Sequence, residues 1–111
     1  MNNSLCRKEV IRMQKLLMLH IDKECDKLSN SANLLLSVKH SFDNQYTDVL
    51  FEHLVKEFDD ISDRLGNLAV AVLKCDGNTE LLKHCIEYIN EMSFIVMNFT
   101  VKVMEYENIA R

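Results

Sequence analysis

The sequence contains no proline or tryptophan, and its 111 residues include only two glycines, Gly66 and Gly77. The strands of β-proteins are joined at short intervals by turns, which draw heavily on glycine and proline. Helices exclude proline from their interiors, because its ring removes a backbone hydrogen bond. A chain so poor in turn residues is expected to be all-α, with residues 1–111 forming one domain of ordinary size.

A membrane-spanning segment and a secretion signal are missing as well. The longest apolar run, MSFIVMNFTVKVM at 92–104, is interrupted by Asn98 and Lys102 and is shorter than the roughly 20 residues of a membrane helix. The N-terminal MNNSLCRKEV has no apolar core of the kind that signal peptides contain. We therefore expect a cytoplasmic protein in which 92–104 belongs to a core helix.

Closely spaced cysteines are also absent. The chain has four cysteines, and none belongs to a CxxC pair: Cys6, Cys25, Cys75 and Cys85. Zinc knuckles and thioredoxin-type redox sites depend on that close spacing. In the reducing cytoplasm, four free thiols are expected.

Basic residues are outnumbered by acidic ones, so the net charge is −4 and the pI is about 5.5. Such a chain lacks the overall positive field on which nucleic-acid binding relies. The local exception is an N-terminal basic cluster: Arg7, Lys8, Arg12 and Lys15. Lys8, Arg12 and Lys15 share one helix face, opposite Val10 and Leu17. We interpret this face as solvated, with docking on phosphates or on an acidic partner as the alternative.

Two segments are expected to interrupt the helical pattern. FDNQYTD at 42–48 gathers side chains that favour caps over helix interiors. KCDGNTE at 74–80 is the stronger signal, because Gly77 can adopt the left-handed conformation that ends a helix. Asn78 or Thr79 can then cap the next helix, with Glu80 in its first turn.

Apolar residues recur at helical intervals in the three segments outside these breaks. The middle segment carries one continuous row: Leu50, Leu54, Phe58, Ile61, Leu65, Leu68 and Val72. The first segment keeps one face through LSNSAN at 28–33: Val10, Leu17, Ile21, Leu28, Ala32, Leu35 and Phe42. The last segment has a wider face, assigned here to the core: Leu82, Cys85, Ile86, Ile89, Met92, Val96, Met97, Val103 and Met104.

This pattern predicts an antiparallel bundle of three long helices, the first running from about Ser4 to Phe42. The alternative is a four-helix bundle in which the first segment breaks near residues 29–31.

The acidic stretch KEFDDISDRLG at 56–66 is the most chemical-looking part of the chain. Asp59 and Asp63 face away from the apolar row, and Asp60 precedes Arg64 at the favourable i,i+4 spacing. His53, Glu57 and Asp60 lie together at the edge of the row and are the candidate ligands for a metal or a phosphate. Di-metal helical bundles use Glu-x-x-His pairs, and this motif does not occur in the chain. Glu24 lies on the inner face of the first helix but has no histidine three residues after it. We interpret the stretch as a solvated face and expect no bound metal.

A second cluster could form between helices. Tight turns would bring His20 and His84 to nearly the same level, with Cys85 beside them, and mixed imidazole and thiolate ligands suit zinc or copper. Because His84 and Cys85 are adjacent, they point about 100° apart on a helix. A boundary histidine and a buried thiol are the simpler interpretation.

Two segments carry more apolar side chains than a single core requires. Leu16 and Leu19 project away from the main row of the first helix, and the last helix is apolar over more than a third of its circumference. Such helices usually have a second neighbour, which in a small bundle is often another copy of the chain. The interface candidates are Leu16, Leu19, Phe94, Ile95, Val101 and Tyr106.

Sequence motifs of catalysis and nucleotide binding are absent, including G-x-S-x-G, Walker A, G-x-G-x-x-G and H-E-x-x-H. The sequence therefore predicts a non-catalytic bundle without cofactors that acts by protein–protein contact as an adaptor, regulator or assembly subunit. We expect it to self-associate as a homodimer or a larger homo-oligomer.

Overall fold

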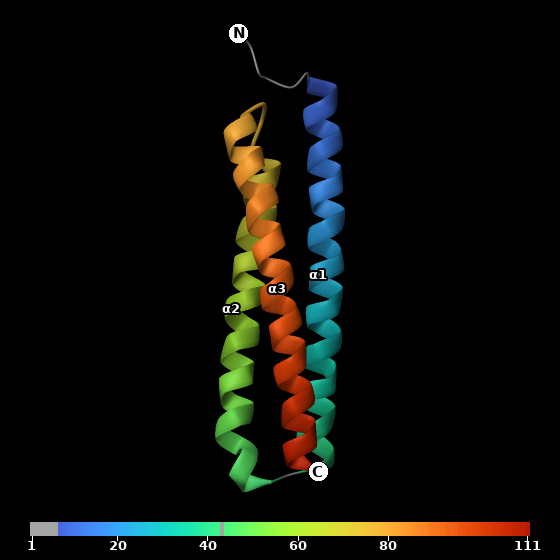
Figure 1. Ribbon diagram of the computed structural model, residues 1–111, viewed down its shortest axis with the longest axis vertical. Coiled ribbons are helices and arrows are strands. Elements are labelled where there is room, and N and C mark those ends of the chain that lie inside the picture. Colours follow the sequence, from blue (N-terminus) through green and yellow to red (C-terminus); the bar gives the residue numbers. More distant parts are fainter. Residues whose placement is uncertain (1–6, 43) are drawn as a thin grey trace.

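The computed structural model describes residues 7–42 and 44–111 of the chain. It contains three long helices and one short 3₁₀ turn: α1 (Arg7–Ser41), η1 (Gln45–Thr47), α2 (Asp48–Leu73) and α3 (Thr79–Ala110). The helices lie side by side in a rod of 61 × 17 × 17 Å, with α2 running against α1 and α3 (Figure 1). The three-helix bundle is confirmed and the four-helix alternative is wrong. The predicted start of the first helix at Ser4 lies outside the described residues.

Helix α1 stays unbroken through residues 29–31 because its polar side chains there are either exposed to solvent or hydrogen-bonded. Ser29 and Asn30 face solvent, whereas Ser31 is buried. The hydroxyl of Ser31 lies 2.7 Å from the hydroxyl of Thr100 on α3, so its burial is matched by a hydrogen bond. The helix therefore needs no break at this point.

The buried residues of each helix are three, four or seven apart, and on α3 the intervals alternate strictly between three and four. On α3 these residues, which we call the core row, are Leu82, Cys85, Ile89, Met92, Val96, Phe99, Val103, Tyr106 and Ala110. This 3.5-residue repeat is that of coiled coils, in which a narrow seam on each helix faces its neighbours. The core row packs against α2 through two tilted aromatic pairs, Phe58 with Phe99 and Phe51 with Tyr106.

The connections follow the predicted capping chemistry. Asn44 accepts a hydrogen bond from the backbone N–H of Tyr46 and starts η1. Gly77 has φ 81°, the left-handed conformation that glycine adopts without steric cost. The side-chain oxygen of Asn78 accepts from the N–H of Leu81 at 3.0 Å, so Asn78, rather than Thr79, caps α3.

No helix in the described part of the chain has an apolar stretch of the length that crossing a membrane requires.

Candidate functional site

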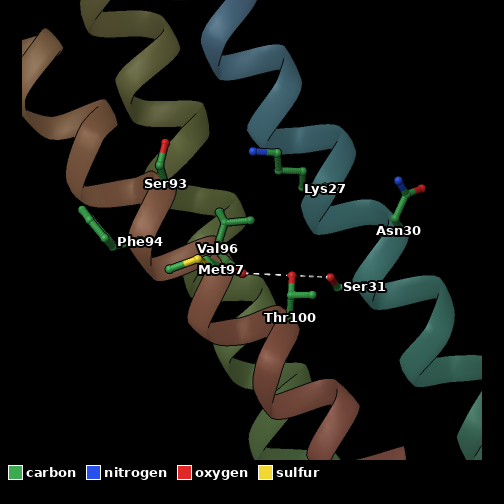
Figure 2. A pocket seen from close by; sticks show the side chains of 8 residues that line it. All are labelled: Lys27, Asn30, Ser31, Ser93, Phe94, Val96, Met97 and Thr100. Atoms are coloured by element: carbon green, nitrogen blue, oxygen red, sulfur yellow. Dashed lines mark hydrogen bonds between the residues drawn. The ribbon is translucent and has the colours of Figure 1, made fainter.

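Helix α3 carries a second apolar row on the side away from the core. This outer row consists of Phe94, Met97, Val101 and Met104, whose side chains are 66%, 53%, 47% and 52% exposed. Its members are again three and four residues apart, and at about 100° per residue they lie nearly opposite the core row. Figure 2 shows Phe94 pointing away from α1. The helix is therefore apolar on two opposite faces, of which the folded chain covers only one.

The structure agrees with part of the predicted interface on α3 and corrects the rest. Phe94 and Val101 are exposed as expected, and Ile95 is half-buried against the core. The assignment of Tyr106 to an interface is wrong, because it follows Phe99 by seven residues on the core row and is 0% exposed. The assignment of Met97 and Met104 to the core is also wrong. Their spacing fits the outer row, and the core position beside them belongs to Phe99.

A smaller apolar surface lies near the start of α1. Leu16 and Leu19 are each 58% exposed, as expected for interface candidates. Leu19 lines a shallow groove of about 520 Å³ together with Ile11 and with Leu73 at the end of α2. The four basic candidates Arg7, Lys8, Arg12 and Lys15 are exposed, and Lys15 also borders this groove. Their predicted opposites, Val10 and Leu17, are buried.

The acidic stretch of α2 forms ordinary surface ion pairs. Glu57 accepts a hydrogen bond from Lys102 of α3 at 2.9 Å, and Asp60 lies 3.8 Å from Arg64. Arg64 also donates to the hydroxyl of Tyr88, and this hydrogen bond raises the pKa of Arg64. His53 is exposed. Over residues 7–42 and 44–111, no group of three or more His, Cys, Asp or Glu side chains is arranged to hold a metal ion.

A buried polar network joins α1 to α3, and the sequence reasoning missed it. Glu24 is only 2% exposed, and its Oε2 accepts a hydrogen bond from Ser93 at 3.0 Å. Lys27 donates to the same oxygen at 3.4 Å, and Nε2 of His20 lies 3.6 Å from it. Glu24 Oε1 has no hydrogen-bond partner among the described residues. Spacing had placed Glu24 on the inner face of α1, between Ile21 and Leu28, but spacing within one helix cannot identify a partner on another helix.

Beside this network, an open cleft of about 540 Å³ runs between α1 and α3 (Figure 2). Its polar lining includes Lys27, Ser31, Ser93 and Thr100, and its outer edge is formed by Phe94 and Met97. The cleft thus merges with the outer row of α3.

The network contains serine, histidine and glutamate but lacks the geometry of a catalytic triad. In a triad the serine and the carboxylate contact different nitrogens of the imidazole, so that the carboxylate orients the base. Here Nε2 of His20 faces both the Ser93 hydroxyl, at 3.1 Å, and Glu24. Ser93 also donates directly to Glu24, which makes the serine a structural donor.

The cluster of His20, His84 and Cys85 that the sequence left open as an alternative does not form among the described residues. His20 lies level with Ser93, about two and a half turns further along α3 than His84. His84 is exposed and lies 3.9 Å from Glu87, whereas Cys85 is buried. Burial raises the pKa of the Cys85 thiol, and the nearby Cys75 raises it further. The thiols of Cys25, Cys75 and Cys85 are free, and Cys6 lies outside the described residues.

No family model matches this chain, and no curated protein or solved structure matches it either.

Proposed function

We propose that this protein acts by protein–protein contact, as a non-catalytic adaptor, regulator or assembly subunit, and that the outer row of α3 is its main contact surface. The observation that carries the proposal is the second apolar face of α3, which no other part of the described chain covers. A helix that is apolar beyond its core face usually has another neighbour.

The size of the outer row supports this function. A large apolar side chain presents roughly 150–200 Å² when fully exposed, so four half-exposed ones present roughly 400 Å². Contiguous apolar patches of a few hundred Å² are often functional on monomeric proteins. Two of the four residues are methionines, whose flexible thioethers adapt to the surface of a partner.

Leu16 and Leu19 form a second, smaller surface on α1. It lies beside the basic residues Arg12 and Lys15, so it suits a partner that is apolar and acidic. The Glu24 network has a structural role in this proposal, since it connects α1 and α3 inside the bundle.

The test is site-specific photo-crosslinking in the cells that express the protein. A photoreactive residue at Met97 should give discrete adducts of higher mass. The same residue at Leu36, which is 57% exposed on α1 and outside both surfaces, should not. If Met97 gives no adduct in cells or at high protein concentration in vitro, the outer row is not a contact surface.

A further inference from the structure

We infer that the partner on the outer row is the α3 helix of a second copy, packed antiparallel about a two-fold axis level with Phe99. This inference rests on the proposed function and names the occupant of the same surface. It follows from the order of residues along the row and from their volumes.

The outer row is self-complementary in spacing. One further position, four residues away, extends the row at each end. The extended row consists of Asn90, Phe94, Met97, Val101, Met104 and Asn108, and all of these side chains are exposed. The intervals of 4, 3, 4, 3 and 4 read the same in both directions. A two-fold axis level with residue 99 therefore places each position of one copy directly against a position of the other.

The pairs formed in this way are chemically suited to one another. Phe94 meets Met104 of the second copy, and sulfur against an aromatic ring is a favourable contact. Met97 meets Val101 on either side of the axis. At both ends Asn90 meets Asn108, and two amides can each donate and accept a hydrogen bond. The apolar pairs thus lie at the centre of the interface and the polar pairs lie at its rim, as in most protein interfaces.

Side-chain volume favours the antiparallel arrangement over the parallel one. In a parallel pair each residue would face its own copy, so that a Phe94 pair and a Val101 pair would need different distances between the helices. In the antiparallel pair each apolar layer combines a larger side chain with a smaller one, which two straight helices can pack at one distance. Symmetric dimers of this isologous type are also the commonest oligomers.

The exposed area indicates a weak dimer. A stable interface of standard size buries about 800 Å² on each partner, roughly twice what the four apolar residues present. On one flank of the row, Glu91 approaches Glu105 of the second copy, and both are exposed. Because salt screens this repulsion, the dimer should become tighter as the salt concentration rises. A partner that docked through basic side chains would show the opposite dependence.

The first measurement is sedimentation velocity from about 1 µM to about 1 mM, the range in which a weak dimer dissociates. The expected result is a reversible monomer–dimer equilibrium that shifts toward dimer with added salt. Val101→Asp places two carboxylates beside the axis and should raise the dissociation constant at least about tenfold. Leu36→Asp, at a similarly exposed apolar residue of α1, should leave the constant unchanged. Circular dichroism establishes that both variants remain helical.

The second measurement tests the register by disulfide formation. The double variant Asn90→Cys with Asn108→Cys should form a covalent dimer under mild oxidation, and each single variant should remain at the background of the unmodified chain. The two positions are 18 residues apart on one helix, about 27 Å, so they cannot bridge within one copy. Dimerisation of the single variants as fast as that of the double variant would show a parallel pair and overturn the inference.

The outcomes separate the two proposals. A protein that is monomeric at every concentration, yet gives Met97 adducts with a different protein in cells, overturns the dimer and leaves the proposed function intact. A monomer that gives no adduct overturns both.

Discussion

Replacing Glu24 by leucine should stabilise the folded chain. Glu24 occupies a core position of α1 and is 2% exposed, so folding removes its carboxylate from water. Removing one partner of a buried polar group usually destabilises a protein, because the other partner remains buried and alone. In this protein the groups that contact Glu24 can be satisfied without it. Ser93 keeps the imidazole of His20 at 3.1 Å, and Lys27, whose side chain is 63% exposed, returns to water.

The magnitude follows from the separate contributions. Burying an ionised carboxylate costs several kcal/mol even after the protein relaxes. The hydrogen bond from Ser93 returns about 1.5–3 kcal/mol, and the pair with the exposed Lys27 returns less than about 1 kcal/mol. A leucine at this position would bury apolar surface worth about 1.5–3 kcal/mol. We therefore expect Glu24→Leu to raise the free energy of unfolding by about 1–4 kcal/mol.

Urea unfolding followed by circular dichroism at pH 7 measures this change. The protein should be held at one low concentration, because self-association would add to the apparent stability. Leu28→Ala is the matched control one turn away, where a 3% exposed leucine is truncated and about 2–5 kcal/mol should be lost. Glu24→Gln separates charge from shape, because it removes the charge and keeps the length of the side chain.

A Glu24→Leu variant that is less stable than the parent by more than about 1 kcal/mol would refute the reasoning. It would mean that the carboxylate is stabilised by more than the contacts of Oε2. The additional stabilisation would then act on Oε1, which has no hydrogen-bond partner among residues 7–42 and 44–111.

Three further predictions concern the backbone, an aromatic core residue and the thiols. Gly66→Ala should stabilise the protein by about 0.5–1 kcal/mol, because the site is an exposed helix interior with open space around the new methyl group. Gly77→Ala should destabilise it by about 1–2 kcal/mol, because φ is +81°; equal effects in urea unfolding would contradict this distinction. Tyr106→Phe should stabilise the protein by about 1 kcal/mol, because it removes a buried hydroxyl that has no partner among the described residues; a loss of similar size would indicate an unseen partner. Burial raises the thiol pKa of Cys25 and Cys85 on folding, with further contributions from nearby acidic groups at Cys25 and from Cys75 at Cys85. The unfolded chain therefore releases these protons first, and the free energy of unfolding should fall as the pH rises above about 8.5; the fall should be smaller in Cys85→Ala, and a flat profile would contradict it.

The local features of this protein could be predicted from its sequence because their causes are local. The scarcity of proline and glycine indicated helices, and FDNQYTD and KCDGNTE marked both connections through cap and turn residues. The positive φ of Gly77 and the cap at Asn78 are properties of a few consecutive residues. The same holds for the exposure of Leu16 and Leu19, which lie off an otherwise clear row.

The position of one helix against another could not be predicted in this way. Moving the centre of a turn by one residue shifts the levels of the two flanking helices by two residues, and this chain has two turns. Small errors therefore added up: tight turns would place His20 at nearly the level of His84, whereas it contacts Ser93. The inner position of Glu24 was predicted, but its polar network was missed for a related reason, since its donor Ser93 lies 69 residues away in the sequence.

The sequence by itself determined that this chain is all-α, where its two connections lie, and that α3 carries more apolar surface than one core can cover. Only the tertiary structure decided which of the two faces of α3 is the core. Phe99 and Tyr106 lie inside and Met97 and Met104 lie outside, although both rows have the same spacing and similar hydrophobicity. Periodicity cannot distinguish two such rows. The rings of Phe51 and Phe58 on α2 pack against Tyr106 and Phe99, respectively. These contacts place the core row inside the bundle and leave the outer row facing outward.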